Sequence, residues 1–378
     1  MPFYSAGDGD LKTAFLTNAW LMERFVGNSL FAWGANTYGQ LGDNTTTNRS
    51  SPIQTVAQNI NWTSVSCKGD IIAAIKNDGT LWTWSWVNPN NTINLYSSPI
   101  QSIAYGTNWK QVSCGFNHGA AVKTDGTLWC WAYQNVGNVG DNTITARSSP
   151  VQTVAYGTDW KQVSCNSLVT GAVKTNGTLW MWGSNGSGQL GDNTTISRSS
   201  PVQTVTFANN WKQISCGESG TAAIKNDGTL WVWGGQGGDN TAITRSSPVQ
   251  TVAMGSNWAN VSCGSSHTAA IKTDGTLWLW GSNNNGQLGD NTAASKSSPV
   301  QTVAFGTNWK QVSCGLYHTV AIKTDGSMWS WGYNNYGQLG DNTVTARSSP
   351  VQTGTFGNNW KIVACGWYHT AAVTFADI

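Results

Sequence analysis

The residues in this chain that could perform chemistry return at fixed places. All four histidines follow a cysteine in a Cys-Gly-x-x-His context, at His118, His267, His318 and His369. Histidine and cysteine side chains could bind a metal or act as nucleophiles, and the cysteines could also form disulfides. Seven of the eight cysteines recur at one position of a repeat, namely Cys67, Cys114, Cys165, Cys216, Cys263, Cys314 and Cys365.

The spacing argues against disulfides and zinc. Equivalent cysteines lie one whole structural unit apart, whereas a disulfide needs Cα atoms within about 7 Å. No Cys-x-x-Cys pair and no Cys/His pair occurs at zinc-ligand spacing. We therefore expect free, buried thiols and neither a metal nor a cofactor.

A ring of four histidines could still hold a metal at the mouth of a channel. Ile71, Val169 and Gly220 occupy the equivalent position in three other repeats, however, so the ring is incomplete. Histidines held by structural hydrogen bonds are the favoured interpretation. The sequence also has no paired carboxylates outside turns, no Gly-x-Ser-x-Gly motif and no P-loop, which predicts a protein that is not an enzyme.

The repeat itself predicts the fold. The motif Leu-Trp-x-Trp begins at Leu81, Leu128, Leu179, Leu230 and Leu277, with degenerate copies at Leu30 and Met328. These starts divide the chain into seven blocks, 30–80, 81–127, 128–178, 179–229, 230–276, 277–327 and 328–378. Each block holds four short apolar runs separated by Gly, Asn, Asp and Ser, which is typical of four-stranded propeller blades. We expect an all-β, seven-bladed β-propeller over residues 30–378.

The turns predict how the ring closes. An Asp-Gly-Thr turn, as at 125–127, joins the fourth run of one block to the first run of the next, because glycine accepts the positive φ of a tight hairpin. The first run, 30–34, and the last run, 369–374, are left without such a neighbour. Their pairing would close the ring and remove two exposed sheet edges.

Residues 314–340 carry a family resemblance. Their sequence, CGLYHTVAIKTDGSMWSWGYNNYGQLG, resembles the regulator of chromosome condensation repeat in its Gly-x-x-His run, Asp-Gly-x turn, Trp-Gly and Gly-Gln-Leu-Gly. The resemblance covers residues 30–378 and implies a seven-bladed propeller. The founding member of that family exchanges nucleotide on a small GTPase with the help of an inserted β-wedge. No block of this chain contains an insertion that could be such a wedge.

Variation between blocks concentrates in two segments. One lies between Leu-Trp-x-Trp and the following proline and is four residues shorter in blocks two and five. The other follows the repeated cysteine. Strands that alternate in direction would place both segments at one end of every blade, which predicts a binding rim on a rigid scaffold, although loops drifting without selection would look similar. The predicted partner-binding residues are Tyr38, Trp86, Asn90, Phe116, Tyr133, Gln134, Leu316, Tyr317, Tyr333, Tyr336, Trp367 and Tyr368.

Residues 1–29 form a leader outside the repeats. Its segment 10–26 has apolar residues at helical spacing, with Asp10 as a cap and Gly27 as a stop. This pattern predicts an amphipathic helix that packs on the propeller, docks on a partner or forms multimers. The predicted docking residues are Leu11, Phe15, Trp20, Met22 and Phe25.

Composition limits the partners. Only 10% of the residues are charged and the formal net charge is +2, so no basic stripe for nucleic acid is present. No apolar run could span a membrane and no secretory signal precedes the repeats, which together with free thiols predicts folding in the cytoplasm.

The function expected from these features is a structural binding propeller. Uniform tryptophan-rich blades look similar to bacterial virus products, so we expect a tail or fibre component of the virion that contacts virion proteins, or a protein or glycan on the host surface. The first alternative is a secreted or cell-surface, lectin-like carbohydrate-binding propeller. The second is a guanine-nucleotide exchange factor.

Overall fold

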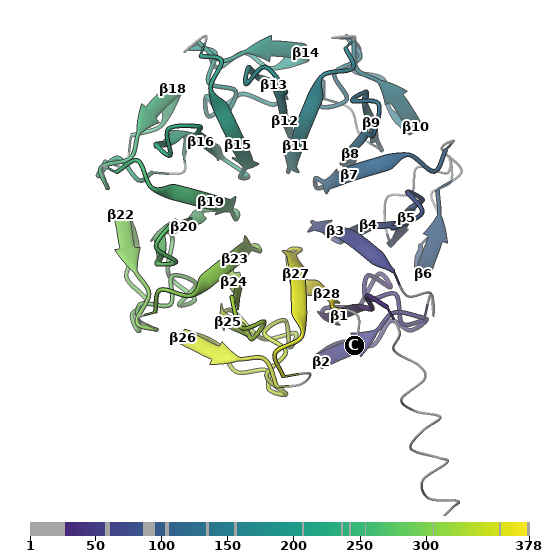
Figure 1. Ribbon diagram of the computed structural model, residues 1–378, viewed down its shortest axis with the longest axis vertical. Coiled ribbons are helices and arrows are strands. Elements are labelled where there is room, and N and C mark those ends of the chain that lie inside the picture. Colours follow the sequence, from purple (N-terminus) through teal and green to yellow (C-terminus); the bar gives the residue numbers. More distant parts are fainter. Residues whose placement is uncertain are drawn as a thin grey trace, which may run out of the picture.

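The computed structural model describes residues 27–56, 61–85, 95–102, 106–133, 136–154, 157–205, 208–235, 237–241, 243–253, 255–304, 306–354 and 357–375. These residues form seven four-stranded antiparallel sheets arranged as blades around a central channel (Figure 1). They contain no helix. Accordingly, no helix in the described part of the chain is long and apolar enough to cross a membrane. The predicted leader helix and its five docking residues lie outside the described residues.

The four strands of each blade lie side by side, and we describe them in order from the channel outward. The innermost strands start at the repeated tryptophan of the Trp-Lys-Gln run and are β3 (Trp62–Lys68), β7 (Trp109–Cys114), β11 (Trp160–Asn166), β15 (Trp211–Cys216), β19 (Trp258–Cys263), β23 (Trp309–Cys314) and β27 (Trp360–Cys365). The second strands are β4 (Ile71–Lys76), β8 (His118–Lys123), β12 (Val169–Lys174), β16 (Gly220–Lys225), β20 (His267–Lys272), β24 (His318–Lys323) and β28 (His369–Thr374).

The two outer positions of each blade carry the Leu-Trp-x-Trp and proline runs. The third strands are β1 (Leu30–Gly34), β5 (Leu81–Ser85), β9 (Leu128–Ala132), β13 (Leu179–Gly183), β17 (Leu230–Gly234), β21 (Leu277–Gly281) and β25 (Met328–Gly332). The outermost strands are β2 (Arg49–Gln54), β6 (Tyr96–Gln101), β10 (Arg147–Gln152), β14 (Arg198–Gln203), β18 (Arg245–Gln250), β22 (Lys296–Gln301) and β26 (Arg347–Gln352).

The ring closes as the repeat predicts. The first six blades, here blades one to six, are continuous in sequence from β3 to β26, and blade seven combines β27 and β28 with β1 and β2. In blade seven, β1 pairs antiparallel with β28, from Leu30 opposite Val373 to Gly34 opposite His369. Each sequence block therefore gives two strands to one sheet and two strands to the next. The chain ends are joined by a sheet in place of two free edges.

The hairpin turns have the expected backbone. Gly126 of the Asp-Gly-Thr turn has φ +80°, a conformation that side-chain-bearing residues rarely adopt. A Cβ there would also collide with the backbone of Thr158, which belongs to the segment leading into the next blade. This turn therefore needs glycine for both its conformation and its packing.

The hydrophobic core lies between blades. It divides into seven clusters, and each cluster is shared by two neighbouring blades. Trp182 of β13, for example, is fully buried against β9 of the preceding blade, while Trp180 on the same strand is half-buried. Burial of such large rings stabilises each junction by about 3 kcal/mol or more per tryptophan.

Candidate binding face

Both variable segments do lie at one end of the blades. The segment after Leu-Trp-x-Trp contacts the segment after the repeated cysteine within the same blade, as the Ser184 amide donates to Leu168 O at 3.0 Å and the Ala35 amide donates to Tyr368 O at 2.8 Å. The Asp-Gly-Thr turns lie at the other end. We call these two ends the variable face and the constant face.

In each of four long loops of the variable face, one asparagine organises the loop. Asn185 is fully buried, and its Nδ2 donates to Asp192 Oδ1, Thr194 O and Ile196 O at 3.1, 3.0 and 3.1 Å. Its Oδ1 accepts from the Leu190 amide at 2.9 Å. Asn36, Asn283 and Asn334 make the same contacts in three other loops.

An aspartate and an arginine form an ion pair within three of these loops, and the carboxylates are buried. Asp192 Oδ2 lies 2.8 Å from Arg198, and the same pairs form between Asp43 and Arg49 and between Asp341 and Arg347. The aspartate side chains are only 2–4% exposed. Burial acts to raise the pKa of Asp192, yet hydrogen bonds from Thr194 and Arg198 outweigh it and lower that pKa. These pairs are therefore part of the loop framework rather than exposed surface contacts.

The loops are also locked to the neighbouring blade. The fully buried Trp233 donates its indole N–H to Gln189 O, in the Gly-Gln-Leu-Gly turn of the preceding blade, at 2.8 Å. Trp33, Trp84 and Trp331 make the same contact with their own preceding blades. The face that displays variable side chains is thus rigidly supported.

The predicted rim residues gather on one sector of this face. Tyr317, Tyr333, Tyr336 and Tyr368 form a cluster across the junction of blades six and seven, with the rings of Tyr336 and Tyr368 5.1 Å apart. Phe116 of blade two stacks on Trp367 of blade seven, with ring centroids 4.4 Å apart and an angle of 18°. We call these six residues the aromatic sector. The stack of Phe116 on Trp367 depends on ring closure, which makes blade seven a neighbour of blade one.

A groove adjoins the aromatic sector toward the channel. It encloses about 450 Å³ and is lined by Glu218, Ser219, Ser265, Ser266, Leu316, Tyr317 and Trp367. Ser265 Oγ donates a hydrogen bond to the Glu218 carboxylate. Leu316 is nearly buried in this groove. An apolar wall next to hydroxyls and a carboxylate suits a ligand with both polar and apolar parts.

Two other predicted rim residues lie elsewhere on the face. Tyr38 is 37% exposed in a blade-seven loop, and Tyr133 is 41% exposed in a blade-two loop. Trp86, Asn90 and Gln134 lie outside the described residues. The structure therefore brings together seven of the twelve predicted rim residues, counting Leu316, at one sector.

Sequence reasoning missed a carboxylate beside the aromatic sector. Asp70 accepts a hydrogen bond from Gln40 Nε2 at 3.2 Å, and burial raises the pKa of its carboxyl to about 6. Its charge also contributes to the raised pKa of Tyr368, after burial and the neighbouring tyrosines. Asp70 stands in the variable segment after Cys67, and only this position in the sequence could have indicated that it belongs to the binding face.

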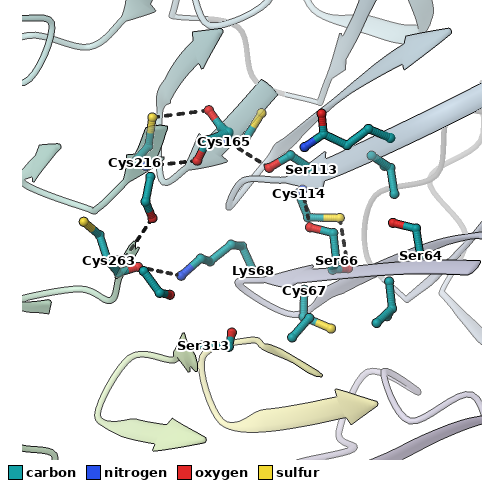
Figure 2. Close-up of a pocket in the computed structure, with 17 residues that line it drawn as sticks. Ser64, Ser66, Cys67, Lys68, Ser113, Cys114, Cys165, Cys216, Cys263 and Ser313 are labelled. Carbon is teal, nitrogen blue, oxygen red and sulfur yellow. Dashed lines mark hydrogen bonds between the residues drawn. The ribbon is translucent and has the colours of Figure 1, made fainter. Parts of the chain in front are cut away.

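A lysine crosses the channel at the same end. Lys68 of β3 extends to the opposite wall, where its Nζ donates to Cys263 O at 3.1 Å and to Cys314 O at 2.9 Å (Figure 2). The equivalent positions carry glycine or, at Asn166, asparagine. Lys68 thus ties blade one to blades five and six across the ring.

The cysteines and histidines have structural environments. All eight cysteines are free and buried, and burial raises the pKa of the Cys263 thiol to about 11. His118, His267 and His318 each place Nε2 3.0–3.1 Å from a threonine hydroxyl of the next blade. The predicted structural hydrogen bond is confirmed for these three. His369 has no such partner among the described residues, because Ile72 stands where the threonine would be.

No group of three metal-binding side chains occurs among the residues that the structure describes. The histidines therefore do not share one site there.

Known proteins resemble both the sequence and the fold. The family model for the RCC1-like domain matches residues 9–303 and 162–377. The ultraviolet-B receptor UVR8 of Arabidopsis thaliana is 31% identical over 245 residues, covering 64% of this chain and 45% of that protein. The mitochondrial RCC1 domain-containing protein RUG3 of Arabidopsis thaliana is 27% identical over 225 residues, covering 56% of this chain and 39% of that protein. The chain spans less than half the length of these relatives.

Two solved structures share the fold over almost the whole chain. Human WBSCR16 superposes with a TM-score of 0.81 at 20% identity, covering 93% of this chain and 100% of that one. Prp20p of Saccharomyces cerevisiae superposes with a TM-score of 0.83 at 16% identity, covering 95% of each chain. With seven closed blades and a family model that matches from the leader to the last strand, the chain belongs to the RCC1-like domain family.

Proposed function

We propose that this protein is a binding module, not an enzyme, and that it holds a protein partner on the aromatic sector of its variable face. The observation that carries the proposal is the convergence of six aromatic side chains from blades two, six and seven next to a groove. Tyrosine and tryptophan dominate the centres of protein interfaces because they bury a large area at a low entropic cost.

The relatives support protein binding in general terms. Prp20p is described as binding Gsp1p and histones, and it has been solved with Kap60 bound. Those partners belong to Prp20p. Exchange activity on a small GTPase is the second candidate for this chain because of that family link, and accelerated nucleotide release from a GTPase would be its direct test.

The place of the protein in a virus particle is part of the proposal. It rests on the uniform tryptophan-rich blades, and the protein should then copurify with particles of its source. A glycan is the alternative ligand, because tyrosine rings beside the Asp70 carboxylate could also stack on a sugar. Absence of the protein from purified particles would remove the virion assignment without affecting the binding face.

The test compares variants that change equal numbers of exposed side chains. The double variant Tyr336→Ser/Tyr368→Ser removes the centre of the aromatic sector. The control Ile196→Ser/Val344→Ser changes two side chains that are 62% and 59% exposed on outer loops. Each protein is immobilised, and binding is quantified against a glycan array and against the proteins of host cells and particles. A ligand kept by the control and weakened at least tenfold by the tyrosine variant supports the proposal.

Equal binding by both variants would overturn the assignment of the aromatic sector. A fragment of residues 28–378 separates the contribution of the leader, since a partner lost only with that fragment would dock on residues 1–27.

A further inference from the structure

A second concave site lies at the opposite end of the channel. The Trp109 amide donates to Gly79 O of an Asp-Gly-Thr turn at 3.1 Å, so the next residue, Lys110, lies at the constant face. Lys161 and Lys212 occupy the same position in the next two innermost strands. The three side chains border a hollow of about 480 Å³ that is lined by Lys110, Gln111, Lys161, Gln162, Lys212, Gln213, Ala259 and Asn260.

The floor of this hollow is rigid. Gln111 Nε2 donates to Val163 O of the next blade at 3.1 Å, and its Oε1 accepts from the Val163 amide at 3.1 Å. Gln162 makes the same pair of contacts with Ile214, at 3.3 and 3.1 Å. The amides of Gln111 and Gln162 are thus committed to joining the blades, whereas the three lysine side chains are exposed.

The three lysines are positively charged groups at the border of the hollow. Their side chains are exposed, and within the described parts of the chain none of them forms an ion pair. The carboxylate nearest to Lys161 in sequence, Asp159, is bound to Lys174 Nζ at 3.1 Å. No aspartate or glutamate stands among the described residues that line the hollow.

The channel wall extends the same charge pattern. Its described lining contains Lys68 and no aspartate or glutamate, so the charge among the described residues of the lining is positive. A concave site of one sign, bounded by protein, focuses its field on ligands of the opposite sign.

From these observations we propose that the hollow binds a small anion carrying several phosphate or sulfate groups. Its volume falls in the range of small-molecule sites. Three ammonium groups would each give charge-assisted hydrogen bonds to separate anionic oxygens. This site is independent of the proposed partner face because it lies at the other end of the blades.

The test uses inositol hexakisphosphate as the probe, with binding measured by isothermal titration calorimetry on the full chain. We expect one site per chain and an affinity that falls at least tenfold between 50 and 300 mM NaCl, because the contacts are ionic. Lys110→Gln/Lys161→Gln should weaken binding at least tenfold. Absence of binding by the unmodified protein at 50 mM NaCl would overturn the proposal.

The matched control is Lys310→Gln/Lys361→Gln, which removes the same charge from the same repeat position. Those two ammonium groups lie over the Phe375 ring, 5.5 and 5.9 Å from its centroid, and do not line the hollow. The affinity of the control for inositol hexakisphosphate should fall less than threefold. Equal losses in both double variants would show a general charge effect and overturn a local site.

Circular dichroism and thermal midpoints must show that all variants are folded. Tyr336→Ser/Tyr368→Ser should bind the probe like the unmodified protein, so the two proposed sites can fail separately.

Discussion

The four histidines stand in nearly identical sequence yet differ in their partners. His118, His267 and His318 each meet a threonine hydroxyl, whereas His369 faces Ile72 across the closing junction. Burial lowers the pKa of His118 to about 4 and that of the other three to about 3. All four are therefore neutral in the folded protein at pH 7.

These lowered pKa values predict a loss of stability in acid. Above pH 6.5 the histidines are neutral in both states, but as the pH falls below 6.5 the unfolded chain takes up protons that the folded chain does not. Between pH 7 and pH 5 each histidine should lower the free energy of unfolding by about 2 kcal/mol. Asp70 acts in the opposite direction, since its raised pKa favours proton uptake by the folded state between about pH 6 and pH 4.

His118→Val isolates one histidine, because blade three already carries Val169 at this position. We expect the loss in the free energy of unfolding from pH 7 to pH 5, measured by urea titration, to be about 2 kcal/mol smaller in the variant. An unchanged pH dependence would show that His118 can be protonated while folded.

At the scale of the element, the long loops of the variable face behave as small folded units. Asn185 Nδ2 bonds to three acceptors of its own loop, its Oδ1 accepts from a fourth group, and Trp233 fastens that loop to the next blade. The repeated GSNGSGQLGDNT pattern of residues 183–194 therefore encodes a framework more than a contact surface. Residues that vary around the framework, such as Tyr336, are free to serve recognition.

Asn185→Ala should destabilise the protein by about 2–4 kcal/mol, because the Leu190 amide and the Thr194 and Ile196 carbonyl groups lose the side chain that they bond to. The control is Thr195→Ala, an exposed residue of the same loop, which should change stability by less than about 0.5 kcal/mol. Urea titration measures both, and hydrogen exchange over residues 184–197 should become faster only in Asn185→Ala. Equal effects in the two variants would contradict the role given to Asn185.

At the scale of the whole molecule, one sheet joins the two ends of the described chain. Blade seven takes two strands from each end, and its cluster with blade one includes Leu30, Trp62 and Val373. Lys68 adds a tie across the channel. No blade can be removed without exposing a tryptophan-rich face.

A circular permutant tests the closure. Thr374 is joined to Leu30 through Thr-Asp-Gly-Thr, and new ends are opened between residues 56 and 61, so that all seven sheets become continuous in sequence. We expect a folded monomer with a thermal midpoint near that of the original chain. A chain that stops after Gly366 lacks β28 and should aggregate, because β1 and β27 lose their shared partner. Aggregation of the permutant on size-exclusion chromatography would contradict the pairing.

The sequence alone determined the blade pattern. Four apolar runs, the Asp-Gly-Thr turn and the unmatched runs at 30–34 and 369–374 predicted the strands, the hairpins and the pairing of those two runs with each other. It could do so because strand burial and turn conformation depend on neighbouring residues, and because the same local solution is repeated seven times.

Only the tertiary structure decided which side chains meet across the ring. Lys68 reaches Cys263, 195 residues away, and Phe116 stacks on Trp367 from two blades away in space. The raised pKa of Asp70 and the lack of a hydrogen-bond partner for His369 among the described residues likewise follow from which blades become neighbours. Such contacts depend on the radius and closure of the ring of blades, and no local pattern of residues encodes the distances between side chains across that ring.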